Sequence, residues 1–555
     1  MPQFVQNGPY IPERLLQAHE EGRVVFFCGA GISYPARLPG FRGLVEELYR
    51  RLEPNASGVQ KLAIKSKQYD TAVGLLEAVV GRERVRRTMA SILTPDLSSP
   101  KATATHKALL NLGRTRDGRT RLITTNFDRL FEEAKPAASF PVHVFQAPLL
   151  PVPKNRWDGL VYLHGLLSEA PTASELDHLV ISSGDFGLAY LTERWAAGFV
   201  SEMFRNYTVC FVGYSITDPV LRYMMDALAA DRLLGESSPE MFAFGSYSQG
   251  GEEDRANEWE AKNVTPILYK EHRRHAYLHK TLQSWAETYR DGVRGKERIV
   301  VESAIARPLA STKEDDFVGR LLWALSDRHG LPAKRFADLE PVPSLDWLTP
   351  LSEARFGHID LARYGVPPNP RLDKKLAFSL MHRPLPYPLA PFMSVVESDG
   401  VSGQWDAVMG HLARWLTRHL DDPALLLWLI NWGGRLHVNF ASGIEHSLEQ
   451  LATLEREGKT DELARMRAGA PNAVPGPLMR TLWRLLLGGR VKVGPRALDL
   501  YRWRNRFNRD GLTSSLRLEF RELLSPRVSL RAPYGSSDEF EGQEQQRLRD
   551  LVGWE

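Results

Sequence analysis

Apolar residues in the first 295 positions fall into two kinds of stretch that follow one another along the chain. Short continuous runs rich in β-branched and aromatic residues predict buried strands, and they occupy positions 24–28, 121–125, 159–163, 208–212, 241–244 and 265–268. Between them, helical spacing predicts helices over 10–21, 105–112 and 275–290, and two or three helical segments over 41–92 with breaks near 54–55 and 67–70. A polar helix is predicted over 249–262. Strands that alternate with helices are typical of an α/β fold. The sequence therefore predicts a Rossmann-like parallel sheet that ends near residue 295.

The pattern changes near residue 300, after which helical spacing dominates. An apolar face over 408–420, followed by Asp422 and Pro423, predicts two helices joined by a short turn. Nine of the 13 tryptophans lie between Trp323 and Trp554, which is typical of densely packed helices. We therefore expect two domains, an α/β domain over 1–295 and a mainly α-helical domain over 296–555.

Length and composition narrow the class of protein. The 555 residues are too many for one typical domain, and 43% hydrophobic with 25% charged residues is ordinary for a globular protein. The net charge of +4 is too small to indicate a nucleic-acid-binding protein. Without a visible signal peptide or an apolar run long enough to span a bilayer, we expect a cytoplasmic protein with no membrane partner. Residues 551–555 close the sequence without a separate tail, which leaves open that it is part of a longer protein.

The two cysteines argue against a metal site. Cys28 and Cys210 each lie inside an apolar strand-like run, which is typical of small buried core residues. Two thiols cannot supply a four-thiolate zinc site, and no histidines and cysteines are spaced like zinc ligands. The sequence predicts that no metal is bound.

One stretch near the C-terminus combines positive charge with aromatic rings. Residues 480–509 hold nine basic side chains and one acid, Asp499. Cations interleaved with rings can bind nucleic acid or a phosphorylated partner. The same pattern is more often an amphipathic helix with a solvated basic face, and we favour that interpretation. Nucleic acid is therefore a possible partner but not the favoured one.

The sequence Gly-Ala-Gly-Ile-Ser at 29–33 directly follows the first predicted strand. Glycine permits a tight turn and close approach of a ligand. Backbone N–H groups exposed at such a turn bind phosphate oxygens. The alternative is that the turn only joins a strand to a helix.

Polar residues follow three other predicted strands. Asn126 and Asp128 come after 121–125, His164 comes after 159–163, and Ser215 comes shortly after 208–212. Open α/β sheets bind ligands at the carboxyl ends of their strands. Each residue also has a structural explanation, because Asn and Asp often form turns or helix caps and a single His is often part of the core.

Together these segments resemble the sirtuin (SIR2) family. Residues 125–128 are similar to the family's Gln-Asn-Ile-Asp, with Thr125 in place of Gln, and 163–165 match its Leu-His-Gly, whose histidine is catalytic. Residues 213–215 resemble a turn that holds the adenosine side of NAD. Arg37 and Gly40 depart from the family's first motif, whose matching positions here are Gly29, Ala30, Gly31, Ile32, Ser33, Pro39, Phe41 and Arg42.

The resemblance implies that NAD is the substrate and gives the matching residues their roles. Asn126 would orient a ribose hydroxyl or a water molecule, and His164 would act as general base. The residues expected to bind NAD are Gly29, Ala30, Gly31 and Ser33 at the pyrophosphate, Arg42 and Asp128 at the nicotinamide end, Gly213 and Ser215 at the adenosine side, and Phe41 as a further contact.

Residues 179–190 and 217–219 resemble a bacterial branch of the family, antiphage effectors with large helical C-terminal regions that hydrolyse NAD when triggered. Sirtuin deacylases build their acyl-lysine groove with a four-cysteine zinc module that this chain cannot form, so water is the expected acceptor. The resemblance implies a NAD+ hydrolase that releases nicotinamide and ADP-ribose. Residues 296–555 would sense a phage-derived or partner-protein trigger, or assemble a homo-oligomer. The alternatives are a NAD-dependent protein deacylase, an ADP-ribosyltransferase, and a non-catalytic sensor of NAD or ADP-ribose.

Overall fold

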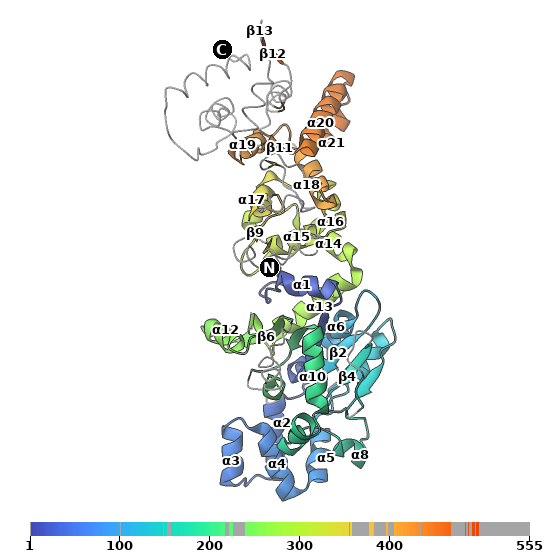
Figure 1. The fold of residues 1–555 in the computed structure, drawn as a ribbon, viewed down its shortest axis with the longest axis vertical. Coiled ribbons are helices and arrows are strands. Elements are labelled where there is room, and N and C mark those ends of the chain that lie inside the picture. The colour runs from blue at the N-terminus through green and yellow to red at the C-terminus, as the bar shows by residue number, and fades with distance from the viewer. Residues whose placement is uncertain are drawn as a thin grey trace. The chain divides into compact units, whose positions relative to one another are not determined.

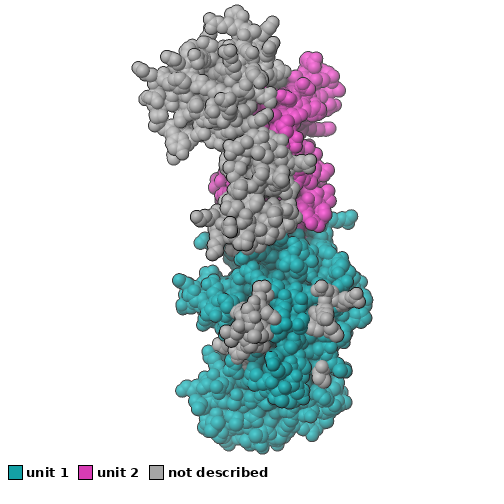
Figure 2. All heavy atoms as spheres, in the orientation of Figure 1, with its two compact units in different colours: residues 1–295, 313–316 teal, residues 296–312, 317–555 magenta. Residues whose placement is uncertain are grey.

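The computed structural model divides the chain into two compact units, residues 1–295 with 313–316, and residues 296–312 with 317–555 (Figure 2). The structure describes residues 2–99, 101–147, 149–151, 157–216, 221–225, 239–353, 405–432 and 435–467, with short pieces at 356–357, 377–381, 396–397, 483, 487, 491–493 and 496–498.

A seven-stranded parallel sheet forms the centre of the first unit, which confirms the predicted fold class. Its strand order is β3-β4-β2-β1-β5-β6-β7. The strands are β1 Val24–Cys28, β2 Arg121–Thr124, β3 Val144–Gln146, β4 Gly159–Tyr162, β5 Thr208–Val212, β6 Met241–Tyr247 and β7 Thr265–Lys270. Six of them fall on predicted strands. The sequence pattern missed β3, because it has only three residues and lies half exposed at the edge of the sheet.

The strand order reverses at β1. The chain runs from β1 to β2, then to β3 at the edge and back to β4 between β3 and β2, and later from β5 on the other side of β1 to β6 and β7. Phe26 of β1 accordingly pairs with Leu122 of β2 and with Cys210 of β5. Ligands of open α/β sheets bind at the carboxyl ends of the strands beside such a reversal. The topology thus places the candidate site at the carboxyl ends of β1, β2, β4 and β5.

The predicted helical stretch 41–92 is divided into four helices that are gathered at one end of the first unit (Figure 1). They bury an apolar core of their own, separate from the core between the sheet and α10. Gly81, at φ 94°, separates two of them at a break that periodicity did not predict. The helices of this unit are α1 Glu13–Glu20, α2 Phe41–Leu52, α3 Gly58–Lys65, α4 Tyr69–Val80, α5 Arg82–Ile92, α6 Ala104–Gly113, α7 Leu130–Ala134, α8 Ala173–Asp177, α9 Ser183–Phe186, α10 Trp195–Asn206, α12 Glu252–Glu260 and α13 Ala276–Asp291, with the short helices η1 Ala30–Ala36, η2 Lys135–Ala137 and η3 Gly187–Thr192.

Helices dominate the described part of the second unit, as predicted. The expected helix pair is present as α18 and α19, and the indole N–H of Trp415 donates to the Pro343 carbonyl at 2.8 Å. The elements are α14 Val293–Ser303, α15 Phe317–Leu325, α16 Leu331–Ala337, α17 Leu348–Ser352, α18 Ala407–Thr417, α19 Pro423–Trp432, α20 Val438–Glu457 and α21 Thr460–Met466, with η4 Pro308–Ala310, η5 Leu345–Trp347 and the two-residue strands β8 Phe356–Gly357, β9 Ala377–Phe378, β10 Val396–Glu397 and β11 Arg435–Leu436. No described helix is both long enough and apolar enough to cross a membrane.

The basic stretch 480–509 lies mostly outside the described residues. Where it is described, β12 Val491–Val493 and β13 Arg496–Leu498 pair antiparallel, so the expected helix is wrong over these residues. The physical reason is the alternation of β-branched valine with lysine at 491–493, which favours a strand. The aromatic residues of the stretch, Tyr501, Trp503 and Phe507, fall outside the described residues.

Candidate active site

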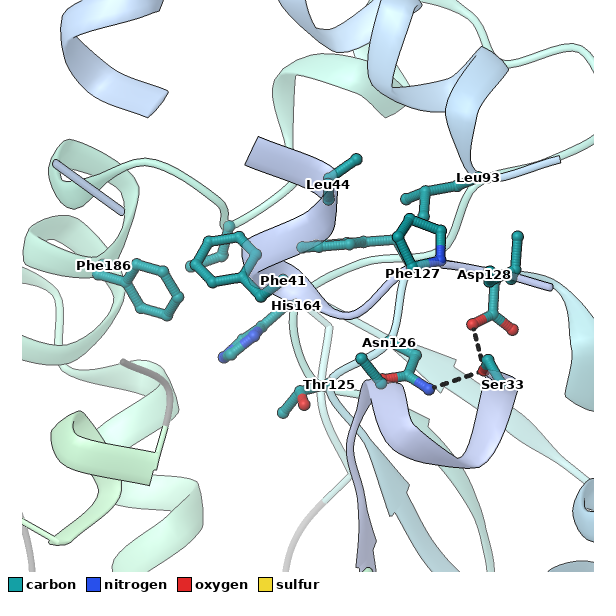
Figure 3. Close-up of a pocket in the computed structure, with 14 residues that line it drawn as sticks. Ser33, Phe41, Leu44, Leu93, Thr125, Asn126, Phe127, Asp128, His164 and Phe186 are labelled. Atoms are coloured by element: carbon teal, nitrogen blue, oxygen red, sulfur yellow. Dashed lines mark hydrogen bonds between the residues drawn. The ribbon is translucent and has the colours of Figure 1, made fainter. Parts of the chain in front are cut away.

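A pocket opens at the carboxyl ends of the central strands and brings together residues from several predicted motifs. In Figure 3, His164 and Phe186 lie toward one end of the site, and Ser33 and Asp128 lie toward the other. The lining residues are Ala30, Ser33, Leu38, Pro39, Phe41, Leu44, Leu93, Thr125, Asn126, Phe127, Asp128, His164, Val180 and Phe186. Of the residues predicted from sequence, Ala30, Ser33, Phe41, Asn126, Asp128 and His164 line this pocket.

Ser33 connects the polar side chains of the pocket. Its hydroxyl donates to Asp128 Oδ2 at 2.8 Å and accepts from Asn126 Nδ2 at 3.2 Å. The Asn126 amide also donates to the Gly29 carbonyl at 3.2 Å, so it is held against the turn that follows β1. His106 Nε2 lies 3.5 Å from the same hydroxyl, a contact that the sequence pattern did not indicate. The two motifs after β1 and β2 therefore form one hydrogen-bonded cluster.

The electrostatics of this cluster are set by burial. Burial raises the pKa of Asp128, although hydrogen bonds from Ser33 and from the Leu130 N–H act in the opposite direction. Burial also lowers the pKa of His106 to about 3, so its imidazole is neutral near pH 7. Its ring packs edge-on against Phe131, with centroids 4.7 Å apart. The helix α7 begins at Leu130, and the Asp128 carboxylate accepts the Leu130 N–H just before it.

His164 is held at the end of β4 as a neutral imidazole. The residue is 1% exposed, and burial lowers its pKa to about 3. Its Nε2 lies 3.0 Å from the Tyr190 hydroxyl, and the Phe186 ring stands edge-on to it at a centroid distance of 5.3 Å. Within the described part of the chain, its Nδ1 has no hydrogen-bond partner. A neutral imidazole with an unpartnered nitrogen can accept a hydrogen bond from a bound ligand, and it becomes an effective base only when the ligand raises its lowered pKa.

The glycines of the first motif are needed for packing against the turn that follows β5. A Cβ on Gly31 would lie 2.9 Å from Gly213 Cα, and one on Gly29 would lie 3.0 Å from the Gly213 carbonyl oxygen. The Gly31 N–H donates to the Gly213 carbonyl at 2.9 Å, and the Gly29 N–H donates to the Val212 carbonyl at 2.8 Å. Both N–H groups are thus paired within the protein, and in this structure they are not available to a phosphate. The motif continues as the short helix η1 instead of an open loop.

Five predicted binding residues do not line the pocket: Gly29, Gly31 and Gly213, which pack against one another beside it, and Arg42 and Ser215. The Arg42 side chain is 71% exposed and pairs with Glu46 at 2.8 Å. Ser215 is exposed at the end of the turn after β5. The motif at 217–219 lies outside the described residues. The structure therefore does not bring Arg42 and Ser215 to Asn126 and His164.

The pocket is small, with a volume of about 50 Å³. Sites for small molecules typically enclose about 300–1,000 Å³. Leu93 and Asp128 also line a neighbouring hollow of about 400 Å³, which is bounded by α5 and by residues 167–171. A ligand as large as nicotinamide riboside therefore requires side chains of the pocket to move.

Arg86 is a buried arginine that holds residues 176–185, the segment next to His164, in place. The sequence pattern did not indicate this role for Arg86. Arg86 is 1% exposed, and its guanidinium bonds Glu77 at 2.7 Å and Asp185 at 2.6 Å. It also donates to the backbone carbonyls of residues 176, 177 and 179. We call this set of contacts the Arg86 clamp. A basic residue between the apolar positions Val85 and Met89 of α5 was the signal in the sequence that could have revealed it.

No group of three or more potential metal ligands occurs among the residues that the structure describes. Cys28 and Cys210 are free thiols buried in β1 and β5. Burial raises the pKa of both thiols, so they are protonated at neutral pH. They lie in the core of the sheet, where they do not line the pocket.

The comparisons with known proteins add to this geometry. A family model described as the SIR2-like domain matches residues 120–267, the part of the chain that supplies Asn126, Asp128 and His164. The uncharacterized protein y4cA of Sinorhizobium fredii is 27% identical over 541 residues, which are 96% of this chain and 39% of that protein. The chain thus spans about two fifths of the length of this relative. Residues 120–267 are therefore similar to the SIR2-like domain, which supports a NAD-related enzymatic activity at the level of that domain family.

Proposed function

We propose that this protein hydrolyses NAD+ to nicotinamide and ADP-ribose. The observation that carries the proposal is that Asn126 and His164, which follow adjacent parallel strands, line one pocket. The similarity of this segment to the SIR2-like domain makes NAD the substrate of choice. A site that only bound NAD would not require a neutral, unpartnered imidazole nitrogen beside an oriented amide.

The chemistry needs few groups from the protein. Water attacks C1′ of the nicotinamide ribose, the C–N glycosidic bond breaks, and nicotinamide leaves with the bonding electrons as a neutral molecule. The leaving group needs no general acid, and the transition state resembles the oxocarbenium ion of glycoside hydrolysis. The enzyme therefore has to orient the ribose and the water and to accept one proton.

The pocket residues fit these tasks. His164 accepts the proton of the attacking water or of a ribose hydroxyl at Nδ1, which has no partner among the described residues. Burial lowers the pKa of its imidazole to about 3, so this role requires the bound substrate to raise that pKa toward neutrality. Asn126, held by Gly29 and Ser33, orients the ribose hydroxyl or the water. Asp128 lies at the opposite end from His164 and is assigned to the nicotinamide end. Because the pocket holds about 50 Å³, substrate binding displaces apolar side chains such as Phe41.

Two other functions are compatible with a NAD site. A protein deacylase or ADP-ribosyltransferase needs an open groove for a protein substrate beside His164, whereas the described pocket has a volume of only about 50 Å³. A non-catalytic NAD or ADP-ribose sensor needs only binding. We favour hydrolysis because the chain has only two cysteines and cannot form the zinc module that completes the groove of sirtuin deacylases.

We further propose that hydrolysis serves antiphage defence and is controlled by residues 296–555. An enzyme that consumed NAD continuously would deplete its own cell, so activity should depend on a trigger or on self-assembly. The helical second unit is the available candidate for that control. The proposed defence role and its control by residues 296–555 rest on the resemblance to bacterial SIR2-like effectors with large helical regions.

The deciding experiment measures nicotinamide and ADP-ribose released from NAD by the purified full chain, with and without candidate triggers. Equal amounts of both products, without an added protein acceptor, are expected. Release of nicotinamide only when an acylated peptide or an acceptor protein is present would favour a transferase. Tight NAD binding without product under every condition would favour the sensor.

A further inference from the structure

The segment after α9 reaches His164 from outside the pocket. Residues Gly187–Thr192 form a π-helical turn, in which the Glu193 N–H donates to the Leu188 carbonyl five residues earlier at 2.9 Å. Single π-helical turns are uncommon and often occur at functional sites. This turn buries Tyr190, which is 3% exposed, and places its hydroxyl 3.0 Å from His164 Nε2.

Several fixed contacts support the position of Tyr190. The Arg86 clamp holds Asp185, and Asp185 accepts a hydrogen bond from the Ser182 hydroxyl at 2.8 Å in the cap of α9. Phe186 follows in α9, and Tyr223 stacks on it at a centroid distance of 4.9 Å. The Tyr190 ring packs against both of these rings. The packing of the Tyr190 ring thus holds its hydroxyl in a fixed position beside His164.

Which nitrogen of His164 is available depends on this contact. Tyr190 does not line the pocket, whereas His164 does. With Nε2 engaged by Tyr190, Nδ1 is the nitrogen left for a ligand, and it has no partner among the described residues. A neutral imidazole carries one proton, so Nδ1 can act as base only when the proton is on Nε2.

We propose that Tyr190 is a positioning residue that accepts a hydrogen bond from His164 Nε2–H, and so leaves the lone pair of Nδ1 directed to the substrate. The inference rests on the proposed hydrolysis, in which His164 is the base. It follows the general arrangement in which a third group orients the catalytic base. The hydroxyl of Tyr190, and not only its ring, is then required.

The test is the Tyr190→Phe variant, which keeps the ring and removes the hydroxyl. Tyr223→Phe is the matched control, because Tyr223 belongs to the same aromatic cluster but donates its hydroxyl hydrogen to Asp70 at 3.0 Å. Full-length protein labelled with 15N-histidine is studied by NMR at neutral pH, and the His164 signals are assigned with His164→Ala. Wild type and Tyr223→Phe should show one tautomer with the proton on Nε2, and Tyr190→Phe should show a mixture.

Nicotinamide release provides a second measurement. Tyr190→Phe should lower kcat about 10–100-fold, as for loss of a group that orients a functional histidine, with KM unchanged. A wild-type spectrum with the proton on Nδ1 would overturn the proposal, even if Tyr190→Phe fails to fold. So would an unchanged His164 spectrum in a folded Tyr190→Phe protein. If wild type releases no nicotinamide with or without candidate triggers, the proposed function fails, while the spectra still decide the tautomer.

Discussion

Two buried polar clusters in the first unit differ in how completely their atoms are paired. In the Arg86 clamp, the guanidinium bonds two carboxylates and three backbone carbonyls. At the pocket, the polar atoms are only partly paired. The Nδ1 atoms of His164, which lines it, and of His106, which contacts Ser33, have no partner among the described residues. A buried polar group without a partner costs free energy. A fully paired cluster therefore indicates a structural role, and a partly paired one indicates a ligand.

The two clusters also shift the pKa of a carboxyl group in opposite directions. Burial acts to raise the pKa of Asp185, but the Arg86 charge and the hydrogen bonds around it outweigh burial and lower it. Burial raises the pKa of Asp128, which has no arginine bonded to it in the described structure. The first carboxylate stabilises the fold when ionised, whereas the second lowers stability when ionised. Mutations in the pocket are therefore expected to affect mainly activity, and mutations in the Arg86 clamp are expected to affect mainly stability.

The largest expected effect is on activity. His164→Ala and Asn126→Ala should each lower NAD hydrolysis about 10²–10⁴-fold, because each removes a group positioned for proton transfer or orientation. The fold should be retained, with a loss of stability of about 1–3 kcal/mol from the hydrogen-bond partners left behind. Nicotinamide release and thermal unfolding measure the two effects.

His178→Ala is the matched control for this prediction, because His178 is exposed and bonds only the Ser174 carbonyl in the described contacts. It should leave both activity and stability unchanged. If His164→Ala and Asn126→Ala retain wild-type turnover, these residues are not catalytic.

The next effect is on stability. Arg86→Ala should lower the free energy of unfolding by about 3–5 kcal/mol. The carboxylates of Glu77 and Asp185 lose their buried partner and keep only the more exposed Arg82, and three backbone carbonyls lose their donor. Denaturant-induced unfolding measures the loss. Arg87→Ala, on the next position of α5, removes an exposed pair with Glu83 and should cost no more than about 1 kcal/mol. Equal losses in the two variants would show that the clamp does not stabilise the fold.

The smallest expected effect is on the pH dependence of stability. The lowered pKa of Asp185 contributes stability that is present above about pH 4, the ordinary value for Asp, and is lost as the pH falls through the folded-state pKa. The raised pKa of Asp128 has the opposite sign, so its ionisation lowers stability as the pH rises above about 4.

Paired variants test these signs. Asp128→Asn should therefore stabilise the protein at pH 7 and lose this advantage below about pH 4. Asp185→Asn should destabilise it at pH 7, with a smaller difference in acid. Unfolding free energies of both variants and of wild type, measured from pH 3 to 8, check these directions. If both variants are more stable than wild type at pH 7, or both are less stable, the two carboxyl groups do not differ in the way proposed.

Much of the fold followed from the sequence alone. Continuous apolar runs such as 24–28 and 208–212 can be buried on both faces only in the interior of a sheet, so they fixed the central strands and the alternation with helices. The edge strand β3 escaped detection, because a short, half-exposed strand needs no continuous apolar pattern. The order of the strands follows from the chain reversing at β1, which local patterns do not encode.

For the candidate site, the sequence supplied residues, and the tertiary structure decided which of them meet. Asn126 and His164 could be placed at strand ends, and parallel strands bring such ends together. Arg42 was expected at the site from its place in the first motif, but its position on the exposed side of α2 directs it to Glu46. Tyr190 and Arg86 act through partners that are distant in the chain, at His164 and Asp185. Contacts of this kind arise from packing between elements, so only the folded structure could show them.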